Sequence, residues 1–135
     1  MSTWPAPITT LTLFADDIAE AKRFYREVFG ARVMFEDDVS AAFDFGNTLV
    51  NVLASTEAPE VIEPVGVAPR DAGTRELITI TVEDVDALAA DLRTRGVELL
   101  NGPVDRPWGV RTAAFRDPGG HVWEIAQPLD ATEGA

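Results

Sequence analysis

One carboxylate, Glu124, stands out among the side chains of this sequence that could take part in chemistry. It follows the segment 117–120, Asp-Pro-Gly-Gly, which is a compact turn signal between two short apolar runs. This pattern predicts a β-hairpin. Because side chains alternate along a strand, Val122, Glu124 and Ala126 share one face, and the carboxylate lies on an otherwise apolar surface. Glu124 could bind a cationic group, transfer protons, or only hydrogen-bond to a polar neighbour, Thr10 or Asn51.

Two further candidates, Trp108 and Arg111, come just before this hairpin. An indole ring can stack on a planar or cationic group of a ligand, although Trp108 could equally hold the closing hairpin in place. Arg111 could bind a carboxylate or phosphate of a ligand. Alternatively it could pair with Glu98 or Asp105 across the sheet.

These residues need elements that position them, and the first half of the chain predicts one helix among four strands. Asp17 is a good N-cap with Glu20 three residues later, and Gly30 is a good helix end. Residues Gly46 and Asn47 signal a tight turn. The run Glu36-Asp37-Asp38 predicts a solvated turn, although it could border a site for a cation. The predicted strands are 8–14, 32–35, 41–45 and 48–53.

The second half repeats this βαβββ pattern, and residues 46–51 correspond to 119–124, which makes Asn51 equivalent to Glu124. Asp84 is expected to begin its helix and Gly96 to end it. Its predicted strands are 77–82, 97–100, 111–115 and 121–126, with a proline-containing loop after residue 100. The region between the halves has no clear hydrophobic period and is rich in proline and glycine, which predicts a linker. We therefore expect an α+β fold in one domain over 1–135, with module one at 7–54, the linker at 55–74 and module two at 75–128.

The repeat also predicts which side chains share a face. Each half is too small to bury its own apolar face, so two curled mixed sheets with helices outside should enclose a ligand cavity. The predicted concave faces carry the candidate ligand-binding side chains Thr10, Thr12, Asn51, Leu77, Thr79 and Glu124. Trp108 and Arg111 complete this predicted ligand-binding set.

Composition excludes several classes of protein. The net charge of −12 argues against nucleic acid, whose phosphates need clustered lysine and arginine, and favours cationic partners. Cysteine is absent, so disulfides and thiolate metal sites are excluded and the cytoplasm is the expected compartment. We expect neither a membrane span nor a secretory leader, because no long apolar run occurs.

The sequence resembles the vicinal oxygen chelate superfamily, which includes glyoxalase I, bleomycin-resistance proteins and extradiol dioxygenases. The resemblance covers residues 10–127. It rests on Phe24-Tyr25 before Phe29-Gly30, on the segment 82–85, Val-Glu-Asp-Val, and on the segment 117–120 followed by Glu124. The segment 107–109, Pro-Trp-Gly, followed by Arg111, is closest to the bleomycin-resistance members, which bind their drug without a protein-held metal.

The resemblance implies four metal-ligand positions, which fall here on Thr10, Asn51, Leu77 and Glu124. Only Glu124 is a good ligand, so we expect no metal and no other cofactor. The resemblance further implies a homodimer that binds or sequesters an antibiotic-like or secondary metabolite, possessing cationic and aromatic groups. The alternative is a lyase, isomerase or thiol transferase in which Glu124 is the catalytic proton shuttle or a metal ligand.

Overall fold

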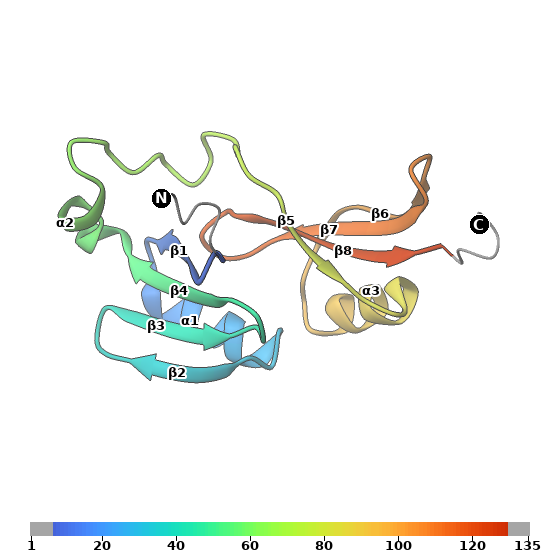
Figure 1. Cartoon of the computed structure of the whole chain (residues 1–135), viewed down its shortest axis with the longest axis horizontal. Coiled ribbons are helices and arrows are strands. Elements are labelled where there is room, and N and C mark those ends of the chain that lie inside the picture. The colour runs from blue at the N-terminus through green and yellow to red at the C-terminus, as the bar shows by residue number, and fades with distance from the viewer. Residues whose placement is uncertain (1–6, 130–135) are drawn as a thin grey trace, which may run out of the picture. The chain divides into compact units, whose positions relative to one another are not determined.

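The chain folds into two βαβββ modules, as the repeated pattern predicts (Figure 1). The structure, a computed structural model, describes residues 7–129. The chain divides into two compact units after Pro69, and each contains one four-stranded mixed sheet. The prediction of an α+β fold with tandem modules is therefore confirmed. No helix within residues 7–129 is long and apolar enough to cross a membrane.

Module one is a sheet with the strand order β1-β4-β3-β2, in which β1 runs parallel to β4. Its helix begins as the sequence predicts, because the Asp17 side chain accepts a hydrogen bond of 3.0 Å from the backbone N–H of Glu20. The elements are β1 (Thr10–Ala15), α1 (Ile18–Glu27), β2 (Arg32–Glu36), β3 (Ser40–Asp44) and β4 (Leu49–Ala54).

An aromatic cluster joins α1 to this sheet. Tyr25 on the helix is fully buried, and its ring stacks on Phe43 of β3 with the centroids 5.3 Å apart. Phe29 packs against both Tyr25 and Phe45. Such ring pairs stabilise a core by about 0.5–1.5 kcal/mol each beyond the area they bury. The helix therefore covers one face of the sheet and leaves the other face for different contacts.

The predicted linker is more regular than the sequence suggests. A 3₁₀ turn (Ser55–Glu57) and the short helix α2 (Pro59–Ile62) follow β4 directly. Pro59 fits the first turn of α2 because a helix start needs no N–H donor there. Ala58 between the two turns is fully buried and anchors them. The linker predicted over 55–74 therefore contains helical turns in 55–62 and no helix or strand in 63–74.

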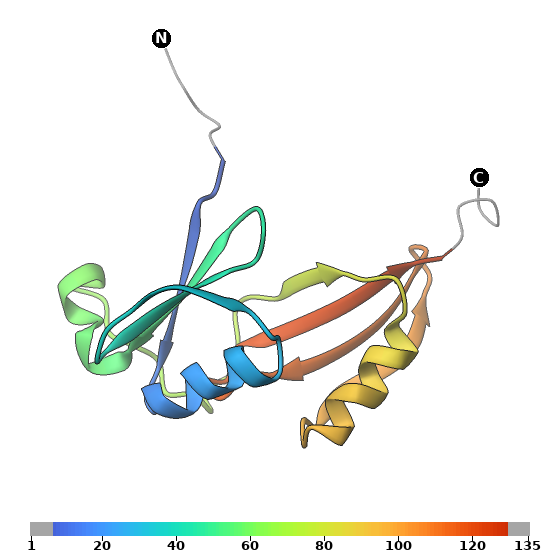
Figure 2. The ribbon, with the colours of Figure 1, turned by 90° about the horizontal axis from the view of Figure 1, so that it is seen from below.

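Module two repeats the topology with the strand order β5-β8-β7-β6, and β5 runs parallel to β8 (Figure 2). Asp84 caps its helix by accepting from the backbone N–H of Ala87 at 3.0 Å. Gly96, at φ +84°, ends the helix, and the Val97 N–H bonds to the Leu92 carbonyl. The elements are β5 (Ile78–Thr81), α3 (Val85–Thr94), β6 (Leu99–Arg106), β7 (Val110–Arg116) and β8 (Val122–Pro128).

Strand β6 corrects the prediction of a short strand and a proline-containing loop. It runs through Pro103 as far as Arg106, with irregular register between Asn101 and Val104. A proline is tolerated there because β6 lies at the edge of the sheet and the ladder is already interrupted. Gly102 is required at this irregularity: at φ +85°, an added Cβ would lie 2.2 Å from the Thr112 carbonyl oxygen.

Candidate functional site

The sheet face of module two that points away from α3 contains Glu124, and we call it the distal face of module two. The ladder places Glu124 between Thr79 on β5 and Ala114 on β7, and Asn101 on β6 lies opposite Ala114. Ala113 and Phe115, the β7 residues on either side of Ala114, belong to the opposite, helix-covered face. The row Thr79, Glu124, Ala114 and Asn101 therefore crosses the whole distal face of module two.

Module one has an equivalent row. Asn51 on β4 lies between Thr12 on β1 and Ala42 on β3, and Phe35 on β2 lies opposite Ala42. The irregular register of β2 before Phe35 matches that of β6 before Asn101. The predicted equivalence of Asn51 and Glu124 is therefore confirmed by the register of both sheets.

Glu124 is half-buried and is fixed by its neighbour on β5. The Thr79 hydroxyl donates a hydrogen bond of 2.9 Å to the Glu124 Oε1 atom. The sequence-based alternative named Thr10 or Asn51 as the partner, and this was wrong, because Thr79 is the direct cross-strand neighbour on the same face. The second carboxylate oxygen accepts no hydrogen bond from any residue in 7–129, so it is free to meet a ligand.

The other two predicted metal-ligand positions, Thr10 and Leu77, are placed differently. Thr10 lies opposite Leu49, and this pair is two residues along the strands from the Thr12–Asn51 pair. Leu77 precedes β5 and is exposed, so no ladder fixes its face. Within residues 7–129 no group of three histidine, aspartate or glutamate side chains could hold a metal ion. The expectation of a protein without a bound metal stays a prediction.

Trp108 lies in the tight turn between β6 and β7 and is 70% exposed. The turn is closed by a hydrogen bond of 3.1 Å from the Gly109 N–H to the Arg106 carbonyl. The Arg106 guanidinium carbon lies 5.9 Å from the centre of the indole ring. Trp108 therefore offers an open aromatic surface beside a cation.

Arg106 is a site residue that the sequence analysis missed. Its Nε donates to the Thr112 hydroxyl at 2.9 Å, and its Nη2 donates to the Asn101 side-chain oxygen at 3.1 Å. Both acceptors lie on the distal face of module two, so the guanidinium lies there too. Because the predicted strand ended at residue 100, the sequence analysis did not recognise that Arg106 belongs to β6 and shares a face with Thr112. The signal that could have found Arg106 is the run 106–108, Arg-Pro-Trp, which places a cation two residues before an aromatic ring.

Arg111, which the sequence analysis placed among the ligand-binding candidates, lies on the opposite face, next to α3. Its Nε and Nη2 bond to Asp86 on α3, and its Nη1 bonds to Asp105 on β6, all at 3.0 Å. The hydrogen bonds that Arg111 donates to Asp105 and Asp86 raise the pKa of Arg111. The pairing alternative was right for Asp105, whereas the second partner is Asp86 rather than Glu98. A ligand role for Arg111 stays a prediction.

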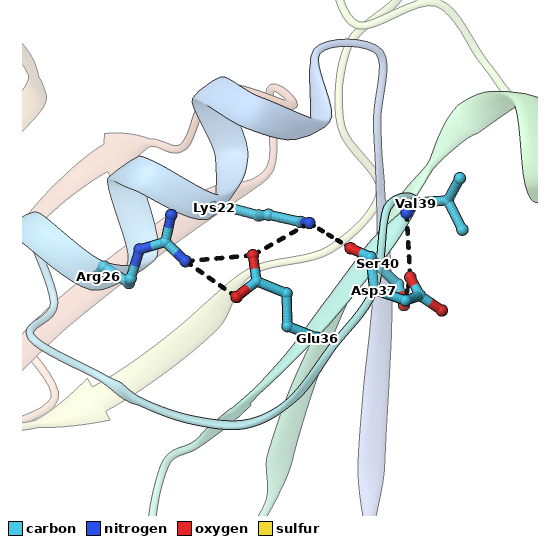
Figure 3. Close-up of polar contacts among 6 residues, drawn as sticks. All are labelled: Lys22, Arg26, Glu36, Asp37, Val39 and Ser40. Carbon is cyan, nitrogen blue, oxygen red and sulfur yellow. Dashed lines mark hydrogen bonds and ion pairs between the residues drawn. The ribbon is translucent and has the colours of Figure 1, made fainter.

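The acidic run after β2 is occupied by partners from its own module (Figure 3). Lys22, which is only 8% exposed, pairs with Glu36 at 3.1 Å and donates to the Asp37 carbonyl. The Lys22 hydrogen bond, followed by that of Arg26, lowers the pKa of Glu36. The Ser40 hydroxyl and the Val39 N–H likewise lower the pKa of Asp37. The Glu36 carboxylate and the Asp37 carbonyl therefore fasten the turn to α1, and the Asp37 carboxylate closes the turn itself.

The turn that leads into β8 depends on a buried carboxylate. Asp117 is 3% exposed and accepts hydrogen bonds from the His121 N–H at 2.9 Å and from the Trp123 indole at 3.3 Å. The ring of His121 contacts Glu76 at 3.1 Å, close to the start of β5. This turn sets the register of β8, and hence the position of Glu124.

The fold and the two matched rows define a tandem βαβββ protein of the glyoxalase type. The model of the Glyoxalase/Bleomycin resistance protein/Dioxygenase superfamily matches residues 8–125. The chain therefore belongs to this superfamily, and the resemblance inferred from the sequence is confirmed.

Three similar proteins show the range of the family. The uncharacterized protein YraH of Bacillus subtilis is 32% identical over 123 residues, covering 88% of this chain and 96% of that protein. A glyoxalase/bleomycin resistance protein/dioxygenase from Nocardioides superposes with a TM-score of 0.84 at 23% identity, covering 96% and 87% of the two chains. TnmS3, an antibiotic binding protein from Streptomyces, superposes with a TM-score of 0.69 at 25% identity, covering 94% and 99%.

Proposed function

We propose that this chain is a cytoplasmic, homodimeric protein that binds an aromatic, cationic metabolite or antibiotic-like compound without a protein-held metal. The observation that carries the proposal is the exposed ring of Trp108 at the end of a sheet face that also contains Glu124. A large ring left open to solvent beside fixed polar groups is typical of a ligand surface.

The proposed binding mode uses Trp108 and Glu124 for different parts of the ligand. The indole would stack on the planar group and bury apolar surface. The Glu124 carboxylate, held by Thr79 at 2.9 Å, would be the counter-ion for the cationic group. Because this carboxylate is already oriented, little side-chain entropy is lost on binding. On module one, Thr10, Thr12 and Asn51 remain proposed ligand contacts.

The comparison with TnmS3 supports this class of ligand, because that protein is an antibiotic binding protein of the same fold. The net charge of −12 adds a long-range attraction for cations, which salt would screen. The fold alone does not decide the function, because one fold can support unrelated chemistries. The proposal therefore depends on the side chains of the distal face of module two.

An enzyme of the same fold is the second candidate, and the Thr79–Glu124 hydrogen bond is the observation that favours it. A carboxylate with one oriented oxygen and one free oxygen could move a proton to or from a bound substrate. Recovery of a co-purified compound separates the two functions. A compound returned unchanged supports binding, whereas conversion that Glu124→Gln abolishes supports catalysis.

The binding proposal is tested with a pair of matched probes, cationic 2-naphthylmethylamine and neutral 2-naphthalenemethanol, by isothermal titration calorimetry. Trp108→Ala should weaken both probes by about 1–3 kcal/mol, because both use the stacking surface. Glu124→Gln should weaken only the cation, by roughly 2–5 kcal/mol. The exposed Glu60 on α2 provides the control Glu60→Gln, which removes the same charge elsewhere. Equal affinity of the cation for wild type and Glu124→Gln would refute the counter-ion role.

A further inference from the structure

The cationic side chains of this chain differ in how their charge is balanced. Of the 11 lysine and arginine residues, five pair with carboxylates: Lys22, Arg26, Arg32, Arg95 and Arg111. The other six have no carboxylate partner among residues 7–129. Five of these six are exposed, where water solvates the charge, and they are Arg23, Arg70, Arg75, Arg93 and Arg116. Arg106 alone of the six is partly buried.

The partners of Arg106 hold it firmly but leave its charge uncompensated. The Thr112 hydroxyl and the Asn101 amide oxygen are neutral acceptors, and they fix Nε and Nη2. Thr112 itself is fully buried, so its hydroxyl is a rigid anchor. A guanidinium has five N–H donors, and only two are used by residues in 7–129. The three remaining N–H donors lie in the plane of a guanidinium that is already oriented, so they can bind a ligand group without further ordering of the side chain.

A partly buried charge without a counter-ion is costly to a folded protein. Carboxylates outnumber cations in the sequence by 23 to 11, yet none within residues 7–129 forms an ion pair with Arg106. The planar fork of a guanidinium matches a carboxylate or a phosphate through two parallel hydrogen bonds. The neighbouring ring of Trp108 extends the same surface for an aromatic group.

We propose that Arg106 is a specificity-determining residue that binds an anionic group, a carboxylate or a phosphate, attached to the aromatic part of the ligand. This inference rests on the proposed function, because it assigns a second charge to the same ligand. Glu124 and Asn101 are separated by one strand, which corresponds to about 10 Å across the sheet. The ligand is therefore amphoteric, with its cationic group at Glu124 and its anionic group at Arg106.

The test compares 2-naphthoate with 2-naphthamide, which share a ring but differ in charge, and includes 2-naphthylmethylamine as a third probe. Dissociation constants come from titrations followed by ¹H–¹⁵N NMR. Wild type should bind naphthoate at least about tenfold more tightly than naphthamide. Arg106→Gln should remove this ratio while leaving naphthamide affinity unchanged, and Arg106→Lys should restore only part of it. Arg93→Gln on the exposed side of α3 removes the same charge and should leave the ratio intact.

The outcomes separate this inference from the function on which it rests. One outcome is that the protein binds naphthylmethylamine but binds naphthoate and naphthamide with equal affinity. This outcome would overturn the role of Arg106 and leave the proposed function standing. An unchanged ratio in Arg106→Gln would also overturn it. Absence of binding by all three probes would overturn both. The wild-type ratio needs no variant, so the inference stays testable even if Arg106→Gln does not fold.

Discussion

Replacing Asp117 tests whether the buried carboxylate of the β7–β8 turn holds module two together. In Asp117→Ala the His121 N–H and the Trp123 indole N–H both lose their acceptor. A hydrogen bond to a charged acceptor contributes about 1.5–3 kcal/mol, and the longer indole contact belongs at the lower end. We therefore expect the free energy of unfolding to fall by about 3–5 kcal/mol. Asp117→Asn keeps one acceptor oxygen and should cost about 1–2 kcal/mol.

The assay is urea unfolding followed by far-ultraviolet circular dichroism, whose signal comes mainly from the peptide backbone. Asp38→Asn is the matched control, because Asp38 is exposed in the β2–β3 turn, and it should change stability by less than about 0.5 kcal/mol. In the double variant Asp117→Ala/Trp123→Phe, the indole donor and the carboxylate acceptor are removed together, so the loss should be smaller than the sum of the single losses. A loss below about 1 kcal/mol for Asp117→Ala would refute the reasoning.

Two further predictions concern acid stability and assembly. The lowered pKa values of Glu36 and Asp37 mean that their stabilising contribution is complete above the ordinary carboxyl pKa values and is lost as the pH falls through the lowered ones. The melting temperature should therefore fall below about pH 4, less steeply in Glu36→Gln than in the control Glu60→Gln, and parallel curves would contradict this. The chain should also sediment as a dimer at micromolar concentration, because the edge strand β2 exposes Met34 and Phe35. A stable monomer at that concentration would contradict the proposed assembly.

The sequence was sufficient for features set by local chemistry. Asp17 and Asp84 were recognised as N-caps because a short acidic side chain is one of the few groups that satisfies the first N–H donors of a helix. The duplicated pattern identified the two modules and the equivalence of Asn51 and Glu124. That equivalence follows from the two-residue period of a strand.

Features set by tertiary context were missed. Pro103 was interpreted as a loop residue, although an edge strand with an irregular ladder tolerates it. That error ended β6 early and concealed Arg106 on the distal face of module two. The partner of Glu124 was sought in module one, whereas the neighbouring strand already supplied Thr79. Asp117 was assigned only to a turn, because its burial depends on the distant packing of Trp123.

The central claim is that a small aromatic cation binds on the distal face of module two without a metal. It is tested most directly by a ¹H–¹⁵N NMR titration of the wild-type protein with 2-naphthylmethylamine after dialysis against a chelator. The account predicts saturable shifts of the Thr79, Thr112 and Glu124 amides and of the Trp108 indole N–H. Shifts confined to α3, or binding that returns only when a divalent metal is added back, would contradict it.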